Sequence, residues 1–226
     1  MGSQFTLDFD ATSAPAVAIR RKVSKRQLRT DLSGTAAACI GHIEPGDEIS
    51  GLTNGQFSLV DMLLHLAQDI GPCDLTISTW TMGVYDADQA FAFTRQGLFR
   101  STRWIVDPSF FSRNAALSGR LVDSFGADAF RAVNTHAKFA TMRSDRVALV
   151  VRTSCNLNRN DRMESFDISA DEQLTAFYEA QIADIFERHA PVGKRPGRAK
   201  ALFSDLAEGY RSTSATPFPI TSNRPF

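Results

Sequence analysis

Hydrophobic residues recur every three or four positions in several segments, which is the spacing of amphipathic helices. We predict helices over residues 58–70, 86–100, about 112–125, about 169–189 and 199–209. The first begins at Ser58, which suits the N-cap position, and ends at Gly71-Pro72. Ser112 is predicted to cap the third. The fourth begins with a capping box, in which Glu172 stands three residues after Ser169.

Other segments are rich in β-branched and aromatic residues and are predicted to form strands. These are residues 74–82, 102–107, 130–142 and 146–153. Residues 44–57 carry turn-forming residues and are predicted to be a loop or hairpin. Because strands alternate with helices along the chain, we expect an α/β fold in which helices flank a mixed β-sheet.

The 226 residues suffice for one substantial domain with short appendages. We assign residues 46–192 to that domain and residues 1–45 to an N-terminal arm. The arm carries six cations within residues 20–29, which either form a solvated face or contact phosphates. Residues 193–226 are predicted to be a basic connector followed by a flexible tail.

Composition and charge exclude several classes of protein. The 25 Lys and Arg residues balance 25 Asp and Glu residues, which argues against a protein that coats polyanions along its whole surface. Three widely spaced cysteines without a C-x-x-C pair argue against a disulfide framework or a zinc cluster. The chain lacks a leader pattern and any apolar run that approaches 18 residues. We therefore expect a soluble cytoplasmic protein that does not contact membranes.

The residues with the most chemical promise lie between positions 135 and 168. His136 and Lys138 are two apart in a predicted strand, so their side chains project from the same face. The next predicted strand ends at Ser154 and Asn156, and Glu164 follows after a short loop. An imidazole, an ammonium group, an amide and a carboxylate are thus expected to share a small volume.

Such a group of side chains suits phosphoryl transfer. A neutral imidazole is a nucleophile near pH 7 and requires no metal ion. Lys138 and Asn156 would donate hydrogen bonds to the oxygens on which negative charge develops. Glu164 would accept a hydrogen bond from the second ring nitrogen of His136 and so orient the ring. Nucleotide-binding glycine motifs are absent from the sequence, and we expect no cofactor and no metal site.

The stretch resembles the motif of the phospholipase D superfamily, H-x-K-x4-D followed by G-S-x-N and a later Glu. The matching positions are His136, Lys138, Ser154, Asn156 and Glu164, and the resemblance covers about residues 55–190. It implies a phospholipase D-like α/β sandwich and a phosphodiesterase that needs no metal ion.

Enzymes of this family use two such motifs in one site, and this sequence contains one. The resemblance therefore implies a homodimer whose twofold axis passes through the site. One His136 would attack phosphorus and form a phosphohistidine, and the other would protonate the leaving oxygen.

The sequence departs from the family motif at several positions. Arg143 stands where the family has Asp, and we expect Asp145 to take over that structural role. Thr153 replaces the glycine before Ser154. The spacing from His to Ser is about three residues longer than usual, so Asn158 is an alternative to Asn156.

The expected substrate is nucleic acid, most simply DNA. Arg143, Arg146, Arg152 and Asn158 surround the motif in the sequence and are predicted to bind substrate. The resemblance supports this, because small members with a single motif are mostly endonucleases. Two alternatives remain. One is a catalytically inactive relative that binds nucleic acid or serves assembly, and the other is a hydrolase of phospholipids or small diesters.

Two aromatic residues and one thiol flank the motif. Trp80 and Tyr85 lie at or beyond the end of a predicted strand, where they could line the site or stack on a base. Core packing is the favoured role for Trp80. Cys155 has no histidine partner in the sequence pattern and is expected to pack rather than to act as a nucleophile.

Overall fold

The structure is a computed structural model, and it describes residues 25–30, 34–113, 115–157 and 162–192. Eight strands form one mixed sheet in the order β1-β2-β8-β7-β6-β3-β4-β5. Their bounds are β1 Lys25–Thr30, β2 Asp47–Thr53, β3 Cys73–Thr79, β4 Phe99–Val106, β5 Phe130–Ala132, β6 Phe139–Arg143, β7 Ala148–Thr153 and β8 Glu164–Ser169. The pairs β1–β2, β3–β4 and β4–β5 are parallel, and the other pairs are antiparallel.

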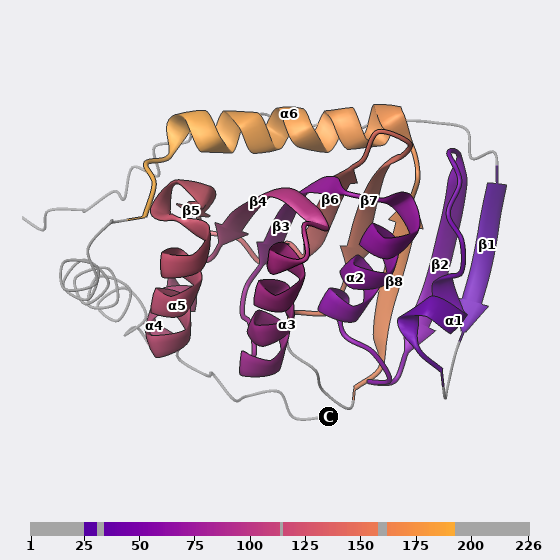
Figure 1. The fold of residues 1–226 in the computed structure, drawn as a ribbon, viewed down its shortest axis with the longest axis horizontal. Coiled ribbons are helices and arrows are strands. Elements are labelled where there is room, and N and C mark those ends of the chain that lie inside the picture. Colours follow the sequence, from indigo (N-terminus) through magenta and orange to yellow (C-terminus); the bar gives the residue numbers. More distant parts are fainter. Residues whose placement is uncertain (1–24, 31–33, 114, 158–161, 193–226) are drawn as a thin grey trace, which may run out of the picture.

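Helices lie on both faces of this sheet (Figure 1). They are α1 Ala36–Ile40, α2 Leu59–Ile70, α3 Val84–Arg95, α4 Ser109–Arg113, α5 Ala115–Phe125 and α6 Glu172–Arg188, with a short 3-10 turn at Ala127–Ala129. In Figure 1, α6 runs along one face and α2, α3 and α5 cover the other. The predicted α/β sandwich with a mixed sheet is confirmed.

Helix α2 forms where the sequence predicted it. Ser58 and Asp61 make a reciprocal capping box, and Gly71 ends the helix with φ 86°. The buried face of the helix meets the sheet in the main core, which extends to Trp104 and Phe130, whose rings stack with centroids 5.7 Å apart. The core therefore fixes the sheet against α2, α3 and α5, and the ends of the strands are held rigidly.

Several element boundaries differ from the prediction. Residues 44–57, expected to be a loop or hairpin, contain β2. The predicted strand 130–142 is two strands, because β5 ends at Ala132 and β6 begins at Phe139. Helix α6 is capped by Asp171, whose side chain accepts a hydrogen bond from Leu174 N at 2.6 Å. Ser169, the predicted cap, is the last residue of β8.

The N-terminal side of the fold also reaches further than expected. Strand β1 pairs with β2, and α1 buries Ala36, Cys39 and Ile40 in the core. The folded unit therefore includes residues assigned to an arm. At the predicted helix 112–125, the structure has α4 and α5, and Ser112 lies within α4. The predicted helix 199–209, the connector and the tail lie outside the described residues. Among the helices described, none is long and apolar enough to span a bilayer.

Candidate active site

Four strands bring their ends together at one edge of the sheet. β3 and β7 end there, at Thr79 and Thr153, and the antiparallel strands β6 and β8 begin there. Thr153 N donates a hydrogen bond to Lys138 O at 3.1 Å, which extends the β6–β7 pairing past Phe139. Residues just outside these four strands are therefore held in a common region, although they are distant along the chain.

His136 and Lys138 lie in the extended segment that leads into β6. The Lys138 Nζ atom is 3.4 Å from His136 Nδ1 and 3.5 Å from Nε2, and it donates to His136 O at 3.0 Å. Ser78 Oγ donates to the carbonyl of Ala137 between them at 2.9 Å, which holds this segment against β3. The imidazole is exposed and the ammonium is half-buried. The structure thus brings the two predicted groups into direct contact.

Glu164 and Ser154 form the second part of the site. Glu164 is the first residue of β8, and its carboxylate accepts a hydrogen bond from Ser154 Oγ. Ser154 Oγ in turn accepts a hydrogen bond from Ser165 N at 2.9 Å, so the pair is fixed to the backbone of β8. Sequence reasoning expected Glu164 to bind His136. Among the described contacts its partner is Ser154, because the end of β7 lies between β8 and β6.

Burial and the nearby carboxylate of Glu164 shift the pKa of Lys138 in opposite directions. Partial burial lowers the pKa of Lys138 from its ordinary value, and the negative charge of Glu164 offsets part of this effect. A protonated Lys138 amine beside an exposed imidazole is the arrangement that stabilises a phosphoryl group during nucleophilic attack.

Asn156 lies in the turn after β7, between Cys155 and Leu157, which are both buried. Its Oδ1 atom is buried and has no hydrogen-bond partner within the described part of the chain. Leu157 pairs with Met82 across an isolated bridge, which anchors this turn to the segment after β3. Asn158, the predicted alternative, lies outside the described residues.

Cys155 is not a candidate nucleophile. Its side chain is 4% exposed, and burial raises the pKa of the thiol to about 11. The thiolate is the reactive form of cysteine, and it is scarce at neutral pH when the pKa is raised in this way. This agrees with the packing role expected from the sequence.

Sequence reasoning missed one residue near the site and undervalued another. Trp80, which follows β3, places its ring centroid 5.5 Å from that of His136, and the rings are tilted by 59°. The guanidinium carbon of Arg113, at the end of α4, lies 3.7 Å from the Trp80 ring centroid. Trp80 is half-buried rather than a core residue. The position of Trp80 directly after a strand was a usable signal, whereas Arg113 lies on a separate helix and had none.

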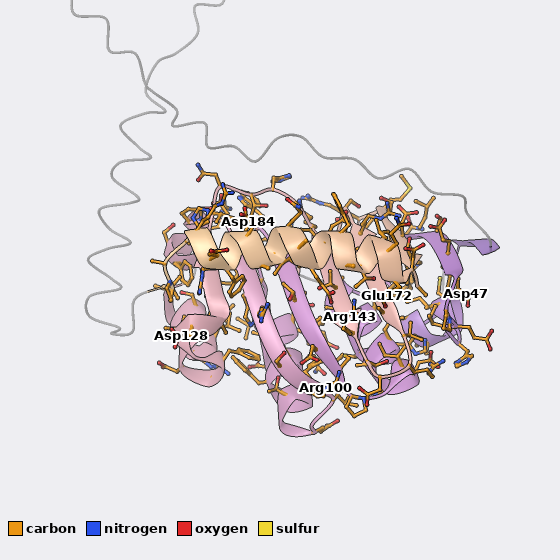
Figure 2. All side chains as sticks on the ribbon, turned by 90° about the horizontal axis from the view of Figure 1, so that it is seen from above. Asp47, Arg100, Asp128, Arg143, Glu172 and Asp184 are labelled. Atoms are coloured by element: carbon orange, nitrogen blue, oxygen red, sulfur yellow. The ribbon has the colours of Figure 1, made fainter. Side chains whose placement is uncertain are left out.

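The structure does not bring Arg143 or Asp145 to the site. Arg143 is at the far end of β6, where it binds Glu179 through Nε at 2.9 Å and Nη2 at 2.7 Å, and Glu172 through Nη1. Figure 2 shows Arg143 beside Glu172 under α6. Asp145 lies in the β6–β7 turn and pairs with Arg100 at 2.7 Å. Both residues join elements of the fold rather than approach His136.

Arg146 and Arg152 are also placed away from His136. Arg146 donates to the carbonyl of Ile43 and to that of Asp69, both at 3.0 Å, near the same turn as Asp145. Arg152 pairs in register with Phe139, which packs against Tyr178 of α6. Its side chain therefore projects from the α6 face, whereas Lys138 projects from the other.

The chain has four histidines, and the other three lie elsewhere. His42 contacts Asp69 at 2.6 Å, His65 contacts Gly41 O at 2.8 Å, and His189 caps the end of α6. A single chain thus offers one imidazole at this edge of the sheet. Among the described residues, no cluster of three His, Cys, Asp or Glu side chains is arranged to hold a metal ion.

Comparisons with known proteins find similar chains among solved structures alone. The searches of family models and of curated proteins find no match. Among solved structures, NucT from Helicobacter pylori is 15% identical, with 64% of this chain and 99% of that chain covered and a TM-score of 0.47. Nuc from Salmonella typhimurium, a phospholipase D family member, is 13% identical, with 64% of this chain and 96% of that chain covered and a TM-score of 0.46. The chain is thus similar in structure to these two proteins, one of which is a phospholipase D family member.

A phosphatidylserine synthase from Haemophilus influenzae is also similar. It is 12% identical, with 74% of this chain and 46% of that chain covered and a TM-score of 0.43. Substrate and mechanism have to be argued from the side chains of this chain.

Proposed function

We propose that the protein is a phosphodiesterase that cleaves nucleic acid, with DNA as the expected substrate, through a phosphohistidine intermediate in a site shared by two copies of the chain. The observation that carries the proposal is the contact between the Lys138 ammonium and the His136 ring. The Glu164 carboxylate lies close enough to Lys138 to offset part of the effect of burial on its pKa. These groups supply a nucleophile and a fixed positive charge for a phosphate.

The first step is attack by a ring nitrogen of His136 on phosphorus. A P–N bond forms, the P–O bond to the leaving group breaks, and Lys138 stabilises the charge on the phosphate oxygens. The leaving oxygen takes a proton from His136 of the partner subunit. In the second step that imidazole, now neutral, accepts a proton from water as the water oxygen attacks phosphorus. The P–N bond breaks, and both rings return to their starting states.

The second copy is needed because one imidazole cannot serve as nucleophile and general acid in the same step. The other three histidines of the chain are engaged elsewhere in the fold or lie at the end of α6. In a dimer with twofold symmetry, His136 of the partner subunit supplies the second imidazole of the shared site, and no other residue is needed. Sedimentation equilibrium at micromolar concentration is expected to give a dimer. A monomer that is fully active would contradict this part of the proposal.

A nucleic-acid substrate is supported by the charge near His136. Arg113 carries a guanidinium beside the site, on the ring of Trp80, which itself lies against the His136 ring. A polynucleotide has further phosphates on both sides of the bond that is cleaved. Wherever the strand is cut, a neighbouring phosphate can therefore pair with a second cation near Lys138, such as Arg113.

The test is cleavage of labelled single-stranded and double-stranded DNA in excess EDTA. We expect cleavage by the natural chain, loss of at least a thousandfold in the rate for His136→Ala, and unchanged cleavage for His189→Gln, the matched control at the end of α6. Binding of DNA without cleavage would contradict the enzyme and favour a non-catalytic relative. Turnover of a phospholipid or small diester alone would overturn the substrate.

A further inference from the structure

Trp80 and Arg113 form a small surface beside His136 that takes no part in the two chemical steps proposed above. The Trp80 ring is half-buried and is tilted by 59° against the His136 ring. The guanidinium carbon of Arg113 lies 3.7 Å from the centroid of the Trp80 ring, which is a stacking distance. We call this pair the Trp80–Arg113 shelf. Its Trp80 ring contacts the ring of His136, the proposed nucleophile.

The local fold holds Arg113 in this position. Helix α4 begins after Asp107, whose carboxylate accepts a hydrogen bond from Ser109 N at 2.9 Å. Phe110 and Phe111 anchor the helix in the core, and Arg113 Nε lies 3.3 Å from Ser109 Oγ. The guanidinium is therefore attached to rigid elements at the ends of β3 and β4.

Arg113 differs from two other arginines that lie over aromatic rings. Arg120, over Phe91, is paired with Asp88 at 2.7 Å. Arg131, over Phe186, donates to backbone carbonyls, for example to Phe130 O at 2.9 Å. Arg113, in contrast, forms no ion pair with any carboxylate in the described segments, and its side chain is exposed. Its charge is available to a ligand.

We propose that the Trp80–Arg113 shelf binds an unpaired nucleobase next to the phosphate that His136 attacks. Aromatic rings and guanidinium planes are the surfaces on which proteins stack single-stranded bases. A base inside a duplex has both faces covered by its neighbours, so the shelf favours single-stranded DNA or an unpaired end over a regular duplex. This inference rests on the proposed function, and it adds a subsite to the phosphate site.

The chemistry of the shelf also argues against a choline headgroup. A Trp ring alone attracts a quaternary ammonium through its negative face. Here the guanidinium of Arg113 occupies a face of that ring and would repel a second cation. A phosphate with a planar neutral group attached, which is a nucleotide, fits the pair better than a phosphate with a cationic group attached.

The experiment measures binding in a His136→Asn background, so that cleavage does not interfere. A fluorescently labelled oligothymidylate and a matched abasic oligonucleotide with the same number of phosphates are titrated and followed by anisotropy. We expect the oligothymidylate to bind about tenfold more tightly, because base stacking on an aromatic contributes about this factor per base. Trp80→Ala and Arg113→Ala are each expected to reduce the ratio toward one, and Trp80→Phe to retain most of it.

Arg120→Ala is the matched control, because it removes another guanidinium stacked on an aromatic ring, and it should leave the ratio unchanged. Intrinsic fluorescence gives an independent readout. The chain has two tryptophans, and Trp104 is 0% exposed, so quenching by the oligothymidylate reports on Trp80. Quenching should be weak with the abasic strand and absent in Trp80→Phe. This readout also shows that each variant is folded, since Trp104 emission shifts to longer wavelength on unfolding.

Each outcome decides something. The proposal that the Trp80–Arg113 shelf binds a base is contradicted by equal affinity for the two strands. It is also contradicted if the affinity ratio is unchanged in Trp80→Ala and Arg113→Ala. Either result leaves the proposed function intact. Absence of binding to both strands overturns the nucleic-acid function and the shelf together. Quenching by phosphatidylcholine vesicles with none by oligothymidylate would show that the surface serves lipid.

Discussion

Replacing Arg143 with Met tests whether this residue serves the fold or the substrate. Met keeps most of the aliphatic stem and removes the guanidinium that joins β6 to α6. In the structure that group makes two hydrogen bonds to Glu179 and one to Glu172. The hydrogen bonds to Glu179, followed by the one to Glu172, raise the pKa of Arg143, so the guanidinium is charged at every accessible pH.

The magnitude follows from the exposure of the partners. The side chains of Arg143 and Glu179 are 34% and 36% exposed, and their bidentate geometry is favourable, so the pair contributes about 1 kcal/mol after solvent screening. Glu172 is 70% exposed, and its pair with Arg143 adds a few tenths of a kcal/mol. The loss is therefore expected to be about 1–1.5 kcal/mol. For a domain of this size that corresponds to a fall in Tm of about 3–5 °C.

The assay is thermal unfolding by circular dichroism at low and at high salt. The difference between Arg143→Met and the natural chain should shrink in 1 M NaCl, because salt screens partly exposed ion pairs. Arg100→Met removes a slightly more exposed guanidinium on β4, whose partners Asp74 and Asp145 are themselves exposed, and is expected to lower Tm less. DNA cleavage should be unchanged at temperatures below unfolding. Unchanged stability together with lost cleavage would refute this reasoning and would indicate that Arg143 binds the substrate.

Two further predictions concern the site and the fold. The alkaline limb of the cleavage rate should have its midpoint below 10.5, the ordinary pKa of lysine, because burial lowers the pKa of Lys138 and only the protonated amine stabilises the phosphate. Glu164→Gln removes the charge that raises this pKa, so the midpoint in a pH–rate profile should move to lower pH; a move to higher pH contradicts the assignment. Ser58→Ala should lower the free energy of unfolding by about 1 kcal/mol, because it removes the cap of α2. Denaturant unfolding measures this loss, and the exposed Ser112→Ala should change it by less.

The elements with explicit end signals could be predicted from the sequence. Helix α2 has an amphipathic repeat, a serine cap and a Gly-Pro stop, and its bounds agree with the prediction within one residue. β2 was missed because its segment contains Gly51 and is flanked by Pro45 and Asn54, which are typical of turns. The pairing of β2 with β1 and β8 is a long-range contact, and local sequence carries no signal for it.

The site could be predicted in part. Spacing alone placed His136 and Lys138 together, because residues two apart in an extended segment share a face. It did not show that residues 133–138 lie between two strands, since an extended segment with alternating side chains has the same pattern whether or not it pairs. Arg143, predicted to bind substrate, lies away from His136 in the structure for a similar reason. Sequence proximity to the motif could not show that Arg143 pairs with α6, which follows 29 residues or more along the chain.

Sequence also could not show that Arg113 reaches Trp80. Trp80 directly follows β3, whereas Arg113 ends the short helix after β4, and the parallel pairing of β3 with β4 brings the two residues side by side. In parallel sheets, residues just beyond the carboxyl ends of neighbouring strands meet at one edge. Trp80 occupies such a position, whereas Arg113 lies further on, at the end of the short helix that follows β4.

The central claim is that His136 attacks phosphorus and that water then releases the product. Two successive in-line displacements retain configuration at phosphorus, whereas direct attack by water inverts it. The most direct measurement is the hydrolysis of a P-chiral phosphorothioate diester of DNA in oxygen-18 water, followed by stereochemical analysis of the product. Retention of configuration is the result predicted here. Inversion would contradict a covalent intermediate on His136 and with it the proposed mechanism.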